Sequence, residues 1–263
     1  MSDLAEHFAG KVAIITGSAV GIGRGVAVTL ARLGMNVAAL DVDVANNAET
    51  ARLVTAAGAQ CLAIECDVGD KHAVKAAVDA AAEKFGGLHL LINNAGYWDN
   101  SALIQGSYES QTAAFDRAMN ASALGSYYCM RAAVDHMRAS GGGNVIGMIT
   151  DHIKPGYYIT GLPAVGYDCA KFAMWRQTET WAQELAEHNI RVNGLCFGAV
   201  DTPMLRAVID EMYATAMEPE DIGQAVVNIV SHGAGGPTGE TWLVAKTHEP
   251  RATGLTEIAA LAP

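Results

Sequence analysis

Short runs of Val, Ile, Leu and Ala recur along the chain and alternate with stretches in which apolar residues return every three or four positions. Unbroken apolar runs are typical of strands buried on both faces of a sheet, and the second spacing is typical of amphipathic helices. Seven strands are predicted, at residues 12–16, 36–41, 61–66, 88–92, 144–150, 190–197 and 241–245. The intervening pattern predicts helices, the longest at residues 112–139 and 166–187 and the last two at 203–217 and 219–231.

Because strands and helices alternate, successive strands should be joined by right-handed crossovers and lie parallel. The expected fold is α/β, with a doubly wound, seven-stranded parallel sheet and helices on both of its faces. Linkers, repeats and low-complexity runs are absent from the sequence, so a single domain is expected over residues 1–263. Its core should span about residues 8–245, followed by an irregular tail at 246–263.

The first predicted strand ends at a glycine-rich turn that contains Gly17, Gly21 and Gly23, and a helical pattern follows directly. Gly17 can adopt a positive φ, and the missing Cβ atoms of the other two glycines let a diphosphate approach the backbone. The helix N-terminus then presents unpaired N–H groups and a partial positive charge to the anion. This segment predicts a dinucleotide site of the Rossmann type.

The cofactor preference is predicted by Asp41, which ends the second strand. A carboxylate there can accept hydrogen bonds from the adenosine ribose hydroxyls and would repel a 2′-phosphate. Neither residues 18–20 nor the residue after Asp41 supplies an Arg or Lys to receive such a phosphate. We therefore expect NAD rather than NADP. In the alternative interpretation Asp41 is an ordinary solvated acid at a strand end.

Tyr167 and Lys171 are four residues apart in a predicted helix, so their side chains share one face. A phenol normally titrates near pH 10, and a neighbouring ammonium favours the phenolate and lowers its pKa. Tyr167 would then serve as an acid or base near neutral pH. The alternative is a chance pair on an exposed helix face.

Taken together and in this order, Thr16-Gly-x-x-x-Gly-Ile-Gly23, Asn93-Asn-Ala-Gly96, Asn120 and Tyr167-x-x-x-Lys171 make the chain resemble the short-chain dehydrogenase/reductase family over about residues 8–245. The resemblance implies that Tyr167 exchanges a proton with the substrate oxygen and that Lys171 holds the nicotinamide ribose. It also implies that Asn120 supports a water relay to Lys171. The cofactor contacts it implies are Gly17, Val20, Gly21, Ile22, Gly23, Asp41, Val42, Asp67, Val68, Asn94, Ala95, Gly96, Tyr167, Lys171, Gly198, Val200 and Thr202.

The chain departs from the family pattern at two places. The usual Ser at the end of the fifth strand is replaced by Thr150, whose hydroxyl can still polarise a substrate oxygen, and Asp151 follows it. Asp151 is either a substrate-contacting acid or a turn residue. Phe197 replaces a Pro after the sixth strand, although the next three expected nicotinamide contacts match. Besides Asp151, the expected substrate contacts are Trp98, Tyr157 and Met204.

Composition narrows the classes of function further. The net charge is −11 without a basic stripe, which argues against nucleic acid or anionic membranes as partners. Five scattered cysteines predict free buried thiols rather than a metal site, and a cytoplasmic location. The two long helices resemble those through which family members form tetramers, so a homo-oligomer, tetramer or dimer, is expected.

The resemblance implies an NAD-dependent enzyme that reversibly oxidises a secondary alcohol to a ketone by hydride transfer, with Tyr167 as the base and no metal. The aromatic residues in the loops favour an aromatic or alicyclic substrate. Two alternatives stay open: a non-catalytic dinucleotide sensor or scaffold on the same fold, and a 3-oxoacyl-type reductase. Turnover with small alcohols, ketones and carrier-linked substrates discriminates among them.

Overall fold

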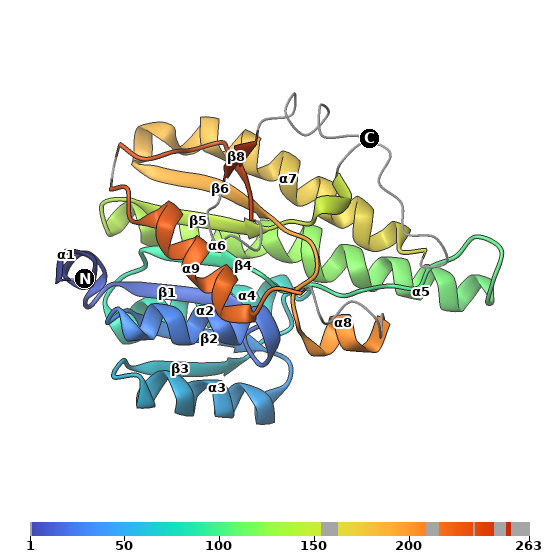
Figure 1. The fold of residues 1–263 in the computed structure, drawn as a ribbon, viewed down its shortest axis with the longest axis horizontal. Coiled ribbons are helices and arrows are strands. Elements are labelled where there is room, and N and C mark those ends of the chain that lie inside the picture. Colours follow the sequence, from blue (N-terminus) through green and yellow to red (C-terminus); the bar gives the residue numbers. More distant parts are fainter. Residues whose placement is uncertain (1, 154–162, 209–215, 234, 245–250, 254–263) are drawn as a thin grey trace.

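The computed structural model describes residues 2–153, 163–208, 216–233, 235–244 and 251–253. One sheet runs through this part of the chain in the order β3-β2-β1-β4-β5-β6-β7-β8 (Figure 1). Its strands are β1 (Val12–Thr16), β2 (Asn36–Asp41), β3 (Cys61–Glu65), β4 (Leu90–Asn93), β5 (Gly143–Met148), β6 (Ile190–Cys196), β7 (Thr241–Leu243) and β8 (Arg251–Thr253).

The first seven strands pair in parallel, which confirms the predicted seven-stranded Rossmann sheet. The eighth strand, β8, is antiparallel to β7 and lies within the tail that was expected to be irregular. The chain reverses its direction of winding between β1 and β4, since β2 and β3 extend the sheet on one side and β4 to β7 on the other. Ligands of such sheets bind at this switch point, beyond the carboxyl ends of the strands.

Helices cover both faces of the sheet. The longer helices are α2 (Gly21–Arg32), α3 (Val44–Ala56), α4 (Lys71–Phe85), α5 (Tyr108–Met119), α6 (Gly125–Ala139), α7 (Val165–Leu185) and α9 (Pro219–Val230). Two shorter helices, α1 (Ser2–Phe8) and α8 (Pro203–Val208), complete the set in the described residues. Helices α2, α3 and α9 contribute to one apolar core, and α4, α6 and α7 contribute to the other.

The alternation of side chains along β1 explains why the sheet is buried on both faces. Ala13 and Ile15 belong to the core beneath α2 and α9, whereas Val12 and Ile14 belong to the core beneath α4 and α6. All four side chains are fully buried. An unbroken apolar run is therefore required of this strand, because neither face reaches solvent.

Two predicted helices differ from the structure. The helix expected at 112–139 begins earlier, at Tyr108, and is interrupted by a π-helical turn at Asn120–Leu124 between α5 and α6. The helix expected at 203–217 is described only at α8, since residues 209–215 lie outside the described part of the chain. Its last expected residue, Met217, is not helical but forms a parallel bridge with Val200.

Candidate active site

The turn between β1 and α2 is shaped for a close approach of the backbone. Gly17 has a φ of +64°, and a Cβ there would lie 2.9 Å from the Cα of Ala95. A Cβ on Gly23 would lie 2.1 Å from the carbonyl oxygen of Gly17. Neither position can therefore accept a side chain unless the turn moves.

The N-terminus of α2 is open to an anion. Its N-cap residue, Val20, has an extended backbone and makes no side-chain cap hydrogen bond, while Gly21 has a φ of +54°. The first N–H groups of a helix have no intrahelical partner, so this end offers donors and the positive end of the helix dipole. These features fit a dinucleotide diphosphate, with Ile22 packed beneath against the core.

The segment after β4 fastens this turn. The Asn94 side-chain amide donates to the carbonyl oxygens of Thr16 and Gly17 at 2.8 and 2.9 Å. In return the Thr16 hydroxyl accepts from the backbone N–H groups of Asn94 and Ala95, both at 3.0 Å. Two of the predicted cofactor segments are thus held together by hydrogen bonds at the switch point.

Asp41 lies at the same edge and also supports the turn. Its carboxylate accepts from the backbone N–H groups of Ala19 at 2.8 Å and Asp43 at 2.9 Å. The neighbouring Val42 is 62% exposed, so it extends beyond the folded core. Asp41 therefore brings an anionic acceptor to the region where an adenosine ribose would lie if the diphosphate occupied the α2 N-terminus.

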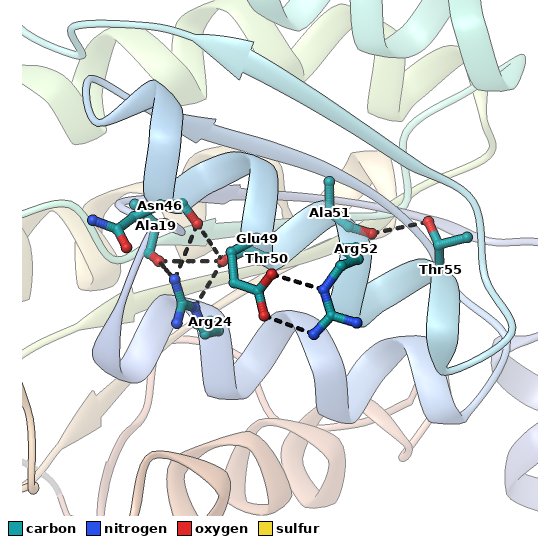
Figure 2. Close-up of polar contacts among 8 residues, drawn as sticks. All are labelled: Ala19, Arg24, Asn46, Glu49, Thr50, Ala51, Arg52 and Thr55. Carbon is teal, nitrogen blue, oxygen red and sulfur yellow. Dashed lines mark hydrogen bonds and ion pairs between the residues drawn. The ribbon is translucent and has the colours of Figure 1, made fainter.

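Arg24 joins α2 to α3 by hydrogen bonds, as Figure 2 shows. Its guanidinium donates to the Thr50 hydroxyl and the Asn46 carbonyl, both at 3.0 Å, and also to the Ala19 carbonyl. The Glu49–Arg52 ion pair beside it, at 2.7 Å, is exposed and adds little stability. Because its donors are directed at these oxygens, Arg24 holds the glycine turn against α3.

The remaining predicted cofactor residues border the same edge. Asp67 accepts from the Gly69 N–H at 2.8 Å, and Val68 is buried against the position of Gly125. A Cβ on Gly21 would lie 3.0 Å from Thr202 Cγ2, which places the segment after β6 against the glycine turn. A cavity of about 280 Å³ lies between them. It is lined by Val20, Gly21, Arg24, Gly25, Asp201, Thr202, Pro203, Arg206, Pro219 and Glu220.

Lys171 is buried in α7 and reaches the end of β5. Its Nζ donates to the Met148 carbonyl at 2.7 Å and lies 5.5 Å from the centroid of the Tyr167 ring. Burial lowers the pKa of Lys171 to about 8, because the charged ammonium is favoured less when it loses water. The structure thus brings the predicted Tyr–Lys pair onto one helix face.

The electrostatics of Tyr167 differ from the sequence expectation. Burial raises the pKa of Tyr167, and the carboxylates of Asp151 and Asp168 raise it further. A hydrogen bond with Thr150 acts in the opposite direction. The expected lowering of this pKa by Lys171 is therefore not found, because Lys171 is directed to Met148 and desolvation of the phenol dominates.

Sequence reasoning missed how the start of α7 is held. Asp99, which is fully buried in the loop after β4, accepts from the backbone N–H groups of Gly166 at 3.2 Å and Tyr167 at 2.7 Å. Helix α7 has no side-chain cap of its own at Ala164. Asp99 therefore supplies the missing cap from a distant loop and fixes the backbone of Tyr167.

Two rings flank the Tyr167 ring, one of them on the expected substrate residue Trp98. The centroid of the Tyr167 ring is 5.0 Å from that of Trp98 and 5.8 Å from that of His152. His152 Nδ1 lies 2.8 Å from Asp168 Oδ1. No local spacing predicts the His152–Asp168 pair, since the two residues are 16 positions apart.

The structure also places Asp151 and Met204, two of the other expected substrate residues. A Cβ on Gly198 would lie 3.2 Å from Asp151 Oδ2, so this carboxylate borders the expected nicotinamide segment. Met204 is 41% exposed on α8, and Phe197 is buried in the core with Val200. Tyr157 lies outside the described residues.

Asn120 follows directly after α5. It is exposed at the start of the π-helical turn, and its Cβ lies against Gly69. The buried hydroxyl beside Lys171 instead belongs to Ser122, which is 1% exposed. The relay role that the resemblance implies for Asn120 stays a prediction.

The part of the chain that the structure describes holds neither a metal cluster nor a membrane-spanning helix. No group of three or more His, Cys, Asp or Glu residues there could hold a metal ion. None of the helices there is long and apolar enough to cross a bilayer. All five cysteines are free, and Cys169 is exposed rather than buried as expected.

Comparisons with known proteins agree with this geometry. The profile of the short chain dehydrogenase family matches residues 11–213. The chain is 32% identical over 247 residues to cis-4-hydroxycyclohexanecarboxylate dehydrogenase from Sinomonas cyclohexanicum, covering 88% of this chain and 92% of the relative. It is 28% identical over 252 residues to cyclohexanol dehydrogenase from an Acinetobacter species, covering 92% and 96% respectively.

A solved structure shows the same architecture with a dinucleotide. The structure of 3-ketoacyl-(acyl-carrier-protein) reductase from Brucella melitensis, complexed with NADH, matches this chain with a TM-score of 0.80 at 27% identity. The match covers 92% of this chain and 99% of that one.

Proposed function

The chain belongs to the short-chain dehydrogenase/reductase family, and from that premise we propose that it oxidises a secondary alcohol to a ketone with NAD, in a reversible reaction. The observation that carries the proposal is the meeting of Tyr167, Thr150 and Lys171 beyond the carboxyl ends of β5 and β6, next to the glycine turn. This is the edge at which doubly wound sheets bind their ligands.

The cofactor would be held by the glycine turn and Asp41. The open N-terminus of α2 supplies donors for the diphosphate, and Asp41 supplies an acceptor for the ribose hydroxyls. The Asp41 carboxylate disfavours a 2′-phosphate, and the donors of Arg24 are already directed at neutral oxygens. These features support NAD over NADP.

The chemistry would rest on proton handling by the chain. NAD, when bound, supplies the hydride acceptor, the C4 atom of its nicotinamide. The Tyr167 phenolate would take the hydroxyl proton of the alcohol, and the Thr150 hydroxyl would hold the same oxygen. Because burial raises the pKa of Tyr167, the hydrogen bond from Thr150 would be needed to favour the phenolate. The Lys171 ammonium does not lower that pKa in the structure, but it would place a positive charge 5.5 Å from the centroid of the ring once the phenolate forms.

The substrate would be an alicyclic or aromatic alcohol. The rings of Trp98 and His152 flank Tyr167 and offer flat surfaces for a cyclic substrate. Two relatives are named for cyclohexanol and for a hydroxycyclohexane carboxylate, which supports the alicyclic class. Asp151 would contact a polar group of the substrate, since its carboxylate borders Gly198.

Exposed apolar side chains on the long helices support a homo-oligomer, tetramer or dimer. Tyr127 on α6 and Phe172 on α7 are 48% and 43% exposed. Such residues are costly to leave in water and are typical of interfaces. Light scattering should show more than one chain per particle, and Phe172→Glu should reduce that number.

The test of the enzyme proposal is a panel of cyclic alcohols, ketones and acyl thioesters, assayed with NAD and NADP on the parent and on Tyr167→Phe. We expect NAD-dependent oxidation of cyclohexanols, and a loss of at least about 100-fold in kcat/KM in Tyr167→Phe with NADH binding retained. Preferential turnover of acyl thioesters would instead identify a 3-oxoacyl-type reductase, as in the Brucella relative. Tight NADH binding without turnover of any substrate would identify a non-catalytic sensor.

A further inference from the structure

A cavity of about 210 Å³ lies at the amino ends of the central strands, at the end of the sheet opposite to the proposed active site. Lys11 and His89, which line it, directly precede β1 and β4. Arg191 lines it from the second position of β6, and His7 lines it from α1. The volume is far larger than the roughly 10–15 Å³ that one water molecule requires, so a small ligand has room.

The side chains around this cavity concentrate positive charge. Lys11 and Arg191 are cations, and His7 and His89 are imidazoles that can be protonated. Neither Asp nor Glu is among the described residues that line the cavity. Glu6, on the same helix as His7, is exposed and does not line it. A chain with a net charge of −11 therefore holds a cavity of the opposite sign, which favours an anion.

Arg191 carries a buried charge with little compensation. The residue is 6% exposed, and its Nη1 has no hydrogen-bond partner. Its Nη2 donates to the Val230 carbonyl at 3.4 Å, which is long for such a bond. A guanidinium has five N–H donors, and a buried charge without a counter-charge is costly. An anion in the cavity would supply the missing counter-charge.

The other basic groups repel one another rather than compensate. Lys11 Nζ lies 3.5 Å from His7 Nε2. Burial lowers the pKa of Lys11, and the charge of Arg191 lowers it further. The backbone N–H of Val12 donates to His89 Nδ1 at 3.2 Å, so the neutral His89 ring carries its own proton on Nε2. An anion beside Lys11 and His7 would relieve their repulsion, because each cation would then face an opposite charge.

We infer that this cavity binds a small, doubly charged oxyanion, held by Arg191, Lys11 and His7. A dianion balances the two fixed charges of Lys11 and Arg191, whereas a singly charged anion balances only one. The guanidinium fork of Arg191 matches oxyanions in shape, and Lys11 adds a compact point charge. A phosphate and a dicarboxylate share this chemistry. The site is independent of the proposed activity, because it uses none of the residues of the glycine turn or of the Tyr167–Lys171 pair.

His7 should make the binding depend on pH. Burial lowers the pKa of His7, the charges of Lys11 and Arg191 lower it further, and a hydrogen bond with the Val230 carbonyl raises it. A bound dianion would raise this pKa, since it favours the protonated ring. Binding then takes up a proton, so the affinity should rise as the pH falls through the range in which His7 titrates.

The experiment is calorimetric titration of the full chain with sulfate, which stays doubly charged near neutral pH, in a cationic buffer with chloride at constant ionic strength. We expect saturable binding by the parent, with an affinity at least about 10-fold lower in Lys11→Gln. Arg191→Lys keeps the charge but loses the fork, and should weaken binding about threefold or more. Lys84→Gln is the matched control, because Lys84 is an exposed cation on α4 away from the cavity, and it should bind within about twofold of the parent.

Two further arms identify the site and the ligand. Titration with malonate distinguishes the sources, since tighter binding than sulfate would indicate a dicarboxylate and weaker binding a phosphate-like ion. Sulfate should bind the parent about fivefold more tightly at about pH 6 than at about pH 8, and His7→Gln should lose most of this difference. Saturating NADH should leave the affinity for sulfate unchanged, because the dinucleotide would occupy the other end of the sheet.

Three outcomes would overturn the inference. One is no binding of sulfate or malonate by the parent. Another is equal affinity in the parent and in Lys11→Gln, when the thermal unfolding of the variant matches that of the parent. The third is displacement of sulfate by NADH, which would place the ion at the glycine turn. Failure of the proposed function is separate from all three, since it would appear as full turnover in Tyr167→Phe.

Discussion

Thr150 is the residue whose contact favours the reactive form of Tyr167. Burial and two nearby carboxylates raise the pKa of the phenol, and the hydrogen bond with Thr150 is the contact that lowers it. The residue stands where related sequences usually have Ser, so a hydroxyl is retained with an added methyl group. The hydroxyl of Thr150 is the group that contacts Tyr167, and its methyl group fills space that a Ser would leave open.

We predict that Thr150→Ala lowers kcat about 10- to 100-fold and raises the apparent pKa of the acid limb for alcohol oxidation. The sign follows because removing a hydrogen bond that favours the phenolate raises the pKa of Tyr167, so a higher pH is needed to form the base. Thr150→Ser should keep the parental profile. Steady-state rates over a pH series would measure this, and an unchanged acid limb in Thr150→Ala would contradict it.

Asp41 combines a structural role with the proposed choice of cofactor. Its carboxylate accepts two backbone N–H groups, at 2.8 and 2.9 Å, while offering further lone pairs to a ribose. We predict that Asp41→Ser raises the KM for NAD at least about 10-fold and gives measurable turnover with NADP. The loss of the two acceptors should also lower the free energy of unfolding by about 1–3 kcal/mol.

Cofactor kinetics and denaturant unfolding would test both effects of Asp41→Ser. Glu49→Ser is the matched control, because Glu49 is an exposed acid on α3 whose ion pair with Arg52 is at the surface. If Asp41→Ser kept the parental ratio of NAD to NADP turnover, the assignment of cofactor preference to this carboxylate would be wrong.

Helix α7 depends on a cap that comes from another element. Asp99 is 67 positions from Gly166 and still accepts from its backbone N–H. We predict that Asp99→Asn lowers the free energy of unfolding by about 1–3 kcal/mol, since a buried charge-assisted acceptor is replaced by a weaker one. The kcat should fall by more than the KM for NAD rises, because the backbone of Tyr167 loses its anchor.

The effect of Asp99→Asn would be measured by denaturant unfolding and steady-state kinetics. Asp70→Asn is the matched control, because Asp70 caps α4 from the position directly before that helix, through the His72 and Ala73 N–H groups. That variant should lose stability without a comparable loss of kcat. Equal kcat values in the two variants would show that Asp99 has no particular link to Tyr167.

The contrast between these caps also shows which parts of the elements the sequence could predict. Asp43 and Asp70 directly precede the helices that they cap, so caps of this kind follow from local order in the sequence. Asp99 caps α7 only after the chain has folded, and no local spacing predicts it. Strands β1 and β2 were predicted to the residue, because burial on both faces demands unbroken apolar runs.

The π turn and β8 were missed for related reasons. Regular helical spacing predicts one continuous helix that includes Asn120 and Ser122. Such spacing does not reveal the π-helical turn in which Ser122 is buried. The three residues of β8 are ordered by pairing with β7, and their own sequence contains no strand pattern. In the site, Tyr167 and Lys171 could be identified from their spacing of four residues. The contacts around Tyr167 could not, because they depend on tertiary packing.

At the scale of the whole molecule, the proposed site and a cluster of basic side chains lie at opposite ends of the sheet. The proposed site lies beyond the carboxyl ends of the strands, while α1 lies near the end where β1 begins (Figure 1). A cavity of about 210 Å³ at that other end is lined by His7, Lys11, His89 and Arg191 among others. Arg191 is buried, and its Nη1 has no hydrogen-bond partner.

This basic cluster should make the fold sensitive to mild acid. Burial lowers the pKa of His7 and of His89, and the charge of Lys11 lowers both further. A base whose pKa is lower in the folded state binds protons more readily when unfolded, so the free energy of unfolding falls as the pH drops below the unfolded value of about 6.5. Lowered carboxylate pKa values, such as that of Asp70, lose their stabilising effect only below about pH 4.

We therefore predict a lower free energy of unfolding at about pH 5.5 than at about pH 7.5, with each histidine contributing at most about 1.4 kcal/mol per pH unit. Urea unfolding at the two pH values would measure it. His7→Gln should flatten the dependence, because it removes one of the depressed bases, whereas His188→Gln, at an exposed position before β6, should leave the slope unchanged. A free energy of unfolding that rises on acidification over this range would contradict the prediction and would mean that the folded cluster favours protonation. Binding of a buffer anion to the cluster would have this effect. A repeat in a buffer with a different anion would separate such binding from the stability of the fold itself.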